Sequence, residues 1–383
     1  MMLRRLGWIT LALAGALGCD DGGTTSADAG PRPAILFEEL YGEVCTVSGC
    51  PGRLLQTACT CVASPLDGFD VNRVGCSELE PEGDVPRTPE ADFCDGAGAS
   101  AAPDLGCFMD GSRPTLGTPE LVTMYGVVEI FDIGVDTNEI TVDVLAEDVD
   151  GRLGTVIGSA LALVGDPAGP CVESDTDFQG GEPVAERRLG FYQIPEVPTE
   201  TPLIVRTRGD SEFWRDVYTY GVIIRNDQVE AAPPADACET VAALEGPLFE
   251  YRPMALSTSD WHDLADSARL TDGVRARSGV VLAEVRDCAD VRLELAQVGT
   301  FPLAVGRAYF DGDATHPRPD PEQMAGTGVL GLWAGLDVPA GQVDVAAIGS
   351  TGGQTVSLGW YRARAFAGAV TRVELRGLRA NQN

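Results

Sequence analysis

The chain has 383 residues, of which 44% are hydrophobic, and this is enough for two or three folded domains with buried cores. Its 58 acidic and 27 basic residues give a formal net charge of −31, which repels phosphate backbones, so nucleic acid is not an expected partner. All basic residues are arginine. The absence of lysine excludes catalysis by a P-loop lysine, a Schiff-base lysine or a serine–lysine pair.

Residues 1–18 have the pattern of a cleaved export signal. Two arginines precede an apolar run that is too short to span a bilayer, which needs about 20 apolar residues. The sequence Ala-Leu-Gly-Cys that ends at Cys19 resembles the lipobox of bacterial lipoproteins. This resemblance implies a mature chain that begins at Cys19, is bound to a membrane through lipid on that residue, and continues in a disordered tether over residues 19–33. The expected location is the bacterial cell envelope, outside the cytoplasm.

The other ten cysteines form an even set in an exported protein, so five disulfides are expected. Seven of them crowd residues 34–115, which we expect to be a cysteine-rich unit held by its bridges. Because seven is odd, at least one pairs outside that unit. Cys171 is the nearest candidate, which leaves Cys238 and Cys288 for each other. The ten candidates are Cys45, Cys50, Cys59, Cys61, Cys76, Cys94, Cys107, Cys171, Cys238 and Cys288.

From residue 121 onward the sequence has segments typical of β-strands. They are rich in β-branched and aromatic residues and are separated by Gly, Pro and Asp. The segments expected to be strands are 121–130, 140–145, 190–194, 203–207 and 217–225, and a second series begins at residue 279. A long loop is expected between them over residues 146–188.

An internal repeat relates the two series. Residues 189–192 lead to Val-Pro at 197–198, and residues 330–333 lead to Val-Pro at 338–339 with the same spacing. An acidic residue, Glu196 or Asp337, precedes each Val-Pro. A repeat of this length indicates two copies of one domain, because the repeats of solenoid proteins are only some 20 to 50 residues long.

The second copy contains the order Gly-Leu-Trp333, then Val-Pro-Ala-Gly341, then an alternating strand through Val343 and Val345. This order resembles the late-strand motif of carboxypeptidase-regulatory-like, transthyretin-type modules. The resemblance implies a mainly β chain in which the cysteine-rich unit is followed by two tandem Ig/transthyretin-like β-sandwiches, over residues 120–230 and 274–378. Such modules bind or pack against other domains and are not catalytic.

Residues 231–273, between the two modules, are expected to be a linker with short helices. Asp260 is the expected N-cap of a helix over residues 261–270. The residues Trp261, Leu264 and Ala265 fall on one face of that helix, and we expect this apolar face to pack on a sandwich.

One acidic segment has spacing similar to that of a calcium loop. Asp175, Asp177, Gln179 and Glu186 follow part of the EF-hand pattern, but the flanking residues are not helical in character. This segment is either a looser calcium site or a solvated acidic turn. Calcium is therefore the one candidate cofactor. The two histidines, His262 and His316, cannot supply a zinc site of several histidines.

Two classes of function remain open. The first is a non-catalytic, lipid-anchored envelope or cell-surface protein whose sandwiches bind a protein or polysaccharide partner or act as a spacer. The alternative is a metal- or carboxylate-dependent extracytoplasmic hydrolase, for example one that acts on glycans. In the first class, the loops over residues 146–188 and 310–327 are the expected partner surface.

Overall fold

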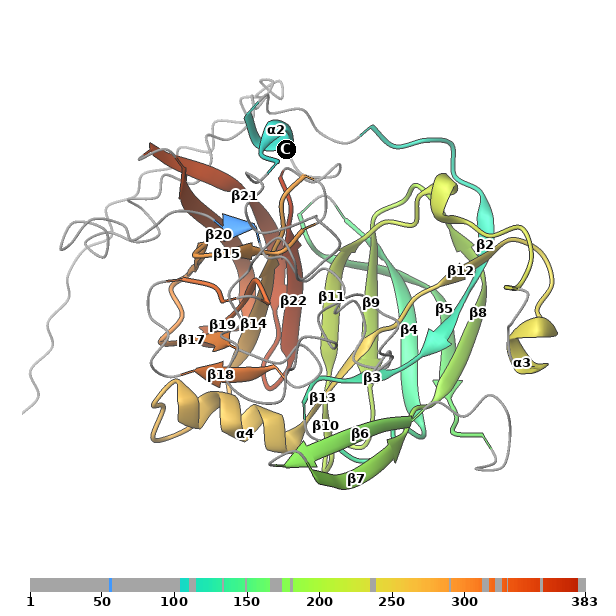
Figure 1. Cartoon of the computed structure of the whole chain (residues 1–383), viewed down its shortest axis with the longest axis horizontal. Coiled ribbons are helices and arrows are strands. Elements are labelled where there is room, and N and C mark those ends of the chain that lie inside the picture. The colour runs from blue at the N-terminus through green and yellow to red at the C-terminus, as the bar shows by residue number, and fades with distance from the viewer. Residues whose placement is uncertain are drawn as a thin grey trace, which may run out of the picture.

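The computed structural model describes residues 55–56, 104–109 and 115–377, except for positions 133, 149, 166–173, 180–181, 235–238, 289–290, 312–316, 321–325, 329 and 352–353. The described chain is mainly β, as the sequence predicts, and its strands form several sheets (Figure 1). The export signal, Cys19, the tether and most of the cysteine-rich unit lie outside the described residues.

The elements follow one another in this order: β1 (Leu55–Gln56), α2 (Gly106–Met109), β2 (Leu121–Val127), β3 (Glu129–Ile130), β4 (Ile140–Glu147), β5 (Leu153–Ala162), β6 (Ser174–Gln179), β7 (Glu182–Arg188), β8 (Phe191–Pro198), β9 (Leu203–Arg208), β10 (Trp214–Arg215), β11 (Val217–Val222), a 3-10 helix (Asn226–Gln228), α3 (Glu239–Ala242), β12 (Leu248–Glu250), β13 (Met254–Ser257), α4 (Thr258–Ser267), β14 (Ser278–Val285), β15 (Leu293–Glu294), β16 (Gln297–Phe301), β17 (Gly306–Asp311), β18 (Arg318–Asp320), β19 (Leu332–Pro339), β20 (Gly341–Thr351), β21 (Gln354–Ala365) and β22 (Val370–Leu375).

A nine-stranded sheet runs through the middle of the molecule, in the order β18-β17-β19-β14-β22-β11-β9-β4-β5. Strands from the two repeats meet at β11 and β22, which pair in parallel with Val217 opposite Val370 and Thr219 opposite Arg372. On its other side β22 pairs in parallel with β14. The first half of the chain, which we take to end with β13, and the second half, which begins with β14, therefore share one hydrogen-bonded sheet.

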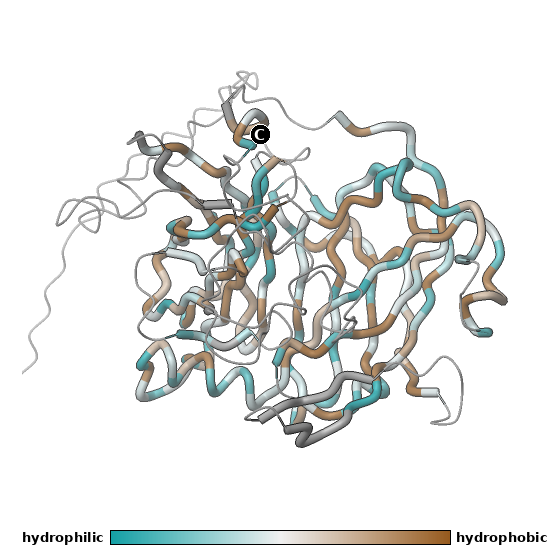
Figure 2. Tube along the Cα trace, in the orientation of Figure 1, coloured by the Kyte–Doolittle hydropathy of each residue, from teal (hydrophilic) through white to brown (hydrophobic). Residues whose placement is uncertain are grey.

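Two smaller sheets cover opposite faces of this central sheet. The sheet β12-β2-β8 encloses one core with β4 and β9, and the sheet β16-β20-β21 encloses another with β14 and β22. Because successive residues of a strand point to opposite faces, β9 contributes to both cores. Leu203 and Val205 belong to the first core, and Ile204 between them belongs to the second. Figure 2 shows the hydrophobic stretches along the strands of both halves.

The pairing of the strands repeats in the two halves. β2 pairs antiparallel with β8 and parallel with β12, and β14 pairs antiparallel with β19 and parallel with β22. The orders β4-β9-β11 and β16-β20-β21 likewise correspond. The relationship between residues 189–198 and 330–339 in the sequence is thus matched by the strands they form.

The helix α4 packs on the central sheet, in a third apolar cluster. Trp261, Leu264 and Ala265 are buried in this cluster together with Val280 and Leu336, so the expected packing of this helix face is confirmed. The expected N-cap at Asp260 is wrong.

Ser257 is the N-cap of α4, and its hydroxyl accepts a hydrogen bond from the Asp260 backbone N–H at 2.9 Å. The carboxylate of Asp260, at the third helical position, accepts from the Ser257 backbone N–H at 3.3 Å. The two residues form a capping box, in which an acidic residue at the third position resembles an N-cap in the sequence.

Two other expectations about segments are corrected. Residues 146–188 are not one long loop, because they contain β5 and the antiparallel hairpin of β6 and β7. The expected linker contains the helices α3 and α4 but also contributes β12 and β13 to the sheets of the first half. All four residues of β13 are buried, and such a short, fully buried strand shows no alternation in the sequence.

The expected bridge between Cys238 and Cys288 is also wrong. Cys288 is bonded to Cys107, with 5.7 Å between their Cα atoms. The helix α2 brings Cys107 to the turn after β14, where the Cys288 backbone N–H donates to the Asp104 carbonyl at 2.9 Å and the Asp104 N–H donates to the Asp287 carboxylate at 3.0 Å. Counting cysteines cannot reveal this proximity. Cys238 and Cys171 lie outside the described residues.

Candidate functional site

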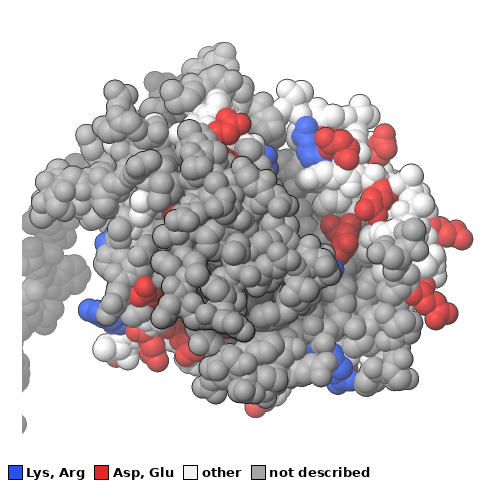
Figure 3. Space-filling model, viewed as in Figure 1, with Lys and Arg blue, Asp and Glu red and all other residues white. Residues whose placement is uncertain are grey.

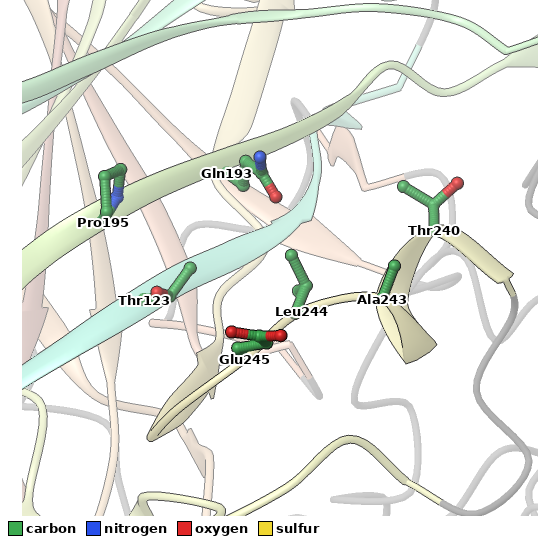
Figure 4. Close-up of a pocket in the computed structure, with 7 residues that line it drawn as sticks. All are labelled: Thr123, Gln193, Pro195, Thr240, Ala243, Leu244 and Glu245. Carbon is green, nitrogen blue, oxygen red and sulfur yellow. The ribbon is translucent and has the colours of Figure 1, made fainter.

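An open pocket of about 520 Å³ lies between the strands β2 and β8 on one side and α3 with its following turn on the other. Thr123 on β2 and Gln193 and Pro195 on β8 form one wall, because these three residues point away from the core on the outer face of their sheet. Figure 4 shows the side chain of Leu244, in the turn after α3, directed toward those strands. The lining is completed by Thr240, Ala243 and Glu245.

The α3 pocket is lined by hydrogen-bonding and apolar side chains. It offers the hydroxyls of Thr123 and Thr240, the amide of Gln193 and a single carboxylate, that of Glu245, around an apolar floor. Hydroxyls and amides orient polar ligands by hydrogen bonds, and apolar side chains contribute contact area. Among the described residues that line the pocket, Glu245 is the one ionisable side chain.

A row of polar side chains crosses the central sheet, on the face that is turned away from β2 and β8. Ser159, Asp143, Arg206 and Tyr218 stand opposite one another on β5, β4, β9 and β11. The Asp143 carboxylate accepts from the Ser159 hydroxyl at 2.7 Å and from Nη2 and Nε of Arg206 at 2.6 and 2.9 Å. Nε of Arg208 donates to the same carboxylate at 3.1 Å. We call Asp143, Ser159, Arg206 and Arg208 the Asp143 cluster.

Both carboxylate oxygens of Asp143 accept hydrogen bonds from other side chains of the protein. The side chain of Asp143 is 3% exposed. Burial alone would raise its pKa, but the hydrogen bonds from Ser159 and Arg206 and the charges of Arg206 and Arg208 hold the pKa below its ordinary value. An ionised carboxylate with this set of donors stabilises the sheet and is not free to act on a substrate.

Asp216, one residue before β11, has the opposite electrostatic environment. Burial raises its pKa above the ordinary value, although the charges of Arg206 and Arg208 oppose this shift. The surroundings of Asp216 therefore favour its protonated form, whereas those of Asp143 favour the ionised form.

A second polar cluster surrounds Glu284 on β14. Its Oε1 accepts from Nη2 and Nε of Arg286 at 2.6 and 3.1 Å and from Nε of Arg292 at 2.8 Å, and its Oε2 accepts from Nη2 of Arg372 at 3.0 Å. The Glu284 side chain is 3% exposed. Burial alone would raise the pKa of Glu284, but the three guanidinium groups hold it well below its ordinary value. This Glu284 cluster joins β14 to β22 through Arg372 and to the turn between β14 and β15 through Arg286 and Arg292.

The sequence pointed to neither carboxylate cluster. Asp143 interrupts the apolar strand β4, and Arg206 and Arg208 occupy alternate positions at the end of β9, on either side of the buried Thr207. Charged residues at alternate positions of otherwise apolar strands are a signal that such side chains meet across a sheet. The strand order needed to identify their partners is not contained in that signal.

The candidate calcium residues lie on a β-hairpin. Asp175, Asp177 and Gln179 are in β6, and Glu186 is in β7 opposite Thr176. An antiparallel hairpin differs from the helix–loop–helix of an EF-hand. Among the side chains that the structure describes, no group of three or more His, Cys, Asp or Glu is placed to hold a metal ion. The side chains of these four residues lie outside that set.

The remaining sequence-predicted residues are placed as follows. His262 is exposed on α4, and His316 lies outside the described residues. No helix in the described part of the chain is long and apolar enough to cross a membrane. On the face shown in Figure 3, acidic side chains are spread along the edge of the first half, and the few arginines are separate from one another.

Comparison of the sequence with models of known protein families found no match, and comparison with curated proteins found none. The candidate function therefore rests on the residues and geometry described above.

Proposed function

We propose that this chain is a non-catalytic protein of the bacterial cell envelope, anchored by lipid on Cys19, whose fused sandwiches act as a binding or spacer module. One observation carries the proposal: the central sheet continues from β11 into β22 through backbone hydrogen bonds. A hinge between the two halves would have to break this pairing. A rigid body of this kind suits a protein that holds a partner in a fixed orientation or acts as a spacer of fixed length.

The disulfide between Cys107 and Cys288 supports a location outside the cytoplasm. It links two segments that are 181 residues apart in the sequence. Disulfides form and persist in oxidising compartments and are rare in the cytosol. Together with the lipobox-like sequence that ends at Cys19, the disulfide supports export followed by attachment to a membrane.

The chemistry of the described side chains supports binding over catalysis. The carboxylates of Asp143 and Glu284 are saturated by internal donors, whereas the α3 pocket presents hydroxyl and amide groups to solvent. A protein or polysaccharide partner is the class that such a surface fits. The similarity of the second copy to transthyretin-type modules points the same way.

A pull-down from detergent-solubilised membranes tests the proposal. The wild type should fractionate with membranes and recover a stoichiometric partner. Cys19→Ser should lose both the lipid label and the membrane fraction. Gln193→Trp, which fills the α3 pocket, should lose the partner, and the matched control Thr155→Trp, at an exposed position on β5, should retain it. Persistent lipid labelling of Cys19→Ser would contradict the lipid anchor. Equal recovery of the partner by both tryptophan variants would contradict binding at the α3 pocket.

The alternative is a carboxylate-dependent hydrolase, and the environment of Asp216 is the observation that favours it. Turnover of a panel of glycans, esters and peptides tests this function. Saturable hydrolysis that is abolished by Asp216→Asn, in a variant that remains folded, would establish the hydrolase and overturn the non-catalytic proposal. Absence of turnover, with partner recovery intact, would support the binding function.

A further inference from the structure

A short apolar loop between β16 and β17 projects into solvent, next to the strand β17 at the left of Figure 1. Phe301, Leu303 and Val305 are 58%, 61% and 61% exposed. These three belong to the nine large hydrophobic side chains that are exposed in the described residues, and they fall within five consecutive positions. Residues 295–306 contain no charged residue. Single exposed apolar residues are ordinary, but a concentration of them marks a contact surface.

The loop is held in one shape by its neighbours. The Val305 backbone N–H donates to the Leu336 carbonyl at 3.0 Å, and the Ala304 N–H donates to the Thr300 hydroxyl at 3.1 Å. Ala304 packs against the core of the second half, and Phe301 is paired with Asp344 on β20. The loop is anchored at both ends, so its three apolar side chains are presented outward by a fixed backbone.

The size of this surface favours lipid over protein as the occupant. A stable protein interface buries about 1,200 to 2,000 Å² in total. Three side chains on a five-residue loop contribute only a fraction of one side of such an interface. A bilayer sets no such minimum, because each apolar side chain that enters the acyl region adds its own favourable transfer free energy.

The charge of the chain favours the same occupant. With a net charge of −31, two copies repel each other, and so do the protein and an anionic headgroup. The segment over residues 295–306 carries no charge, so it adds no repulsion of its own where it meets a lipid surface.

We propose that the loop from Phe301 to Val305 inserts into the lipid surface to which the chain is tethered and so fixes the orientation of the fused sandwiches. This inference rests on the proposed function, in which lipid on Cys19 holds the protein at a membrane. A second, weak contact suits that arrangement, because stable and oriented attachment generally takes two membrane signals.

Full-length lipidated protein on phosphatidylcholine vesicles with brominated acyl chains tests the insertion. The variant Leu303→Trp places a fluorophore on the loop, and Leu121→Trp, at a 59% exposed position at the start of β2, is the matched control. The emission of each is compared with that of the parent protein, which contains the native tryptophans. The emission of Leu303→Trp should shift to shorter wavelength and be quenched several-fold more strongly than that of Leu121→Trp. Adding phosphatidylglycerol should reduce this quenching.

The outcomes separate the two proposals. If both variants float with the vesicles and are quenched equally, or not at all, the insertion is overturned while the tether stands. If neither variant floats, the lipid anchor is wrong and the insertion is overturned with it. If Leu303→Asp converts a stable dimer to monomers in solution, the loop is a protein contact and the lipid assignment is overturned.

Discussion

Glu196 and Asp337 adopt the same left-handed backbone conformation at matching positions of the two halves, with φ angles of 61° and 58°. At each position the register of an antiparallel pair shifts by one residue, between β2 and β8 in the first half and between β14 and β19 in the second. A left-handed residue other than glycine costs free energy, so its presence in both copies identifies the bulge as a conserved element of the repeat within this chain.

Changes at these two bulges should have opposite effects on stability. Glu196 is exposed, so Glu196→Gly should relieve backbone strain and raise the free energy of unfolding by up to about 1 kcal/mol. Asp337 is 3% exposed and its carboxylate accepts from the Arg275 N–H at 3.0 Å and from Nε at 2.6 Å. Asp337→Gly should lower the free energy of unfolding despite the same relief of strain. Urea denaturation measures both, and stabilisation by both variants would contradict the assigned role of Arg275.

Replacing the carboxylate of Glu284 should destabilise the chain strongly. Glu284→Gln leaves Arg286, Arg292 and Arg372 without their shared anion, which should cost about 3 to 5 kcal/mol at neutral pH. A urea denaturation series with Glu374→Gln, at the half-buried position opposite Glu284 on the neighbouring strand β22, is the control and should show a smaller loss.

The same residue predicts a pH dependence. The pKa of Glu284 is depressed in the folded state, so its contribution to stability is present above the pKa of an unfolded Glu, about 4.3, and decreases as the pH falls below it. The unfolded chain takes up a proton there that the folded carboxylate does not. The difference in unfolding free energy between the wild type and Glu284→Gln should therefore shrink between pH 6 and pH 3, and a constant difference would contradict the shift.

Asp143 and Asp216 should respond in opposite directions to removal of their charge. Asp143→Asn removes a buried anion that four hydrogen bonds require, and should cost about 3 kcal/mol. Asp216→Asn removes a carboxyl whose ionisation burial opposes, so at neutral pH it should leave the protein as stable as the wild type or more stable. This gain should shrink as the pH falls through the raised pKa of folded Asp216. It should be lost below the pKa of an unfolded Asp, about 3.9, because the carboxyl is then neutral in both the folded and the unfolded chain. Thermal unfolding at pH 7 and at about pH 3 measures both effects.

Loss of the bridge between Cys107 and Cys288 should lower the free energy of unfolding by about 2 to 5 kcal/mol. Cys107→Ser combined with Cys288→Ser avoids leaving a free thiol, and denaturation under non-reducing conditions gives the difference from the wild type. Peptide mapping without reductant should recover Cys107 and Cys288 in one linked pair. Recovery of Cys288 linked to Cys238 would refute the pairing seen here.

The sequence was sufficient for part of the local structure of the chain but not for how its halves join. The segments around β4, β9 and β11 are recognisable because they are rich in β-branched and aromatic residues. β13 escapes detection because it is fully buried and only four residues long, and β5 because its residues are mostly small and uncharged. Pairing between β11 and β22 depends on contacts between distant segments, which no local pattern encodes.

For the candidate sites the sequence was less informative. It identified carboxylates in abundance, but could not separate Asp143 and Glu284, which are bound to arginines across the sheet, from carboxylates in solvent. The α3 pocket brings Thr123 together with Leu244, and their proximity comes from the parallel pairing of β12 with β2. The exposed loop at Phe301 is visible in the sequence as an uncharged stretch, yet only the fold distinguishes it from a buried strand.

The pairing of β11 with β22 has a consequence for synthesis. The ribosome completes β11 long before it reaches Val370, so throughout that interval β11 presents an edge whose final neighbour does not yet exist. An unpaired edge readily joins a strand of another nascent chain. Maturation of the first half is thereby coupled to the translation of β22. A chain that stops before β22 should be a substrate for chaperones and proteases even though every strand of its first half is present.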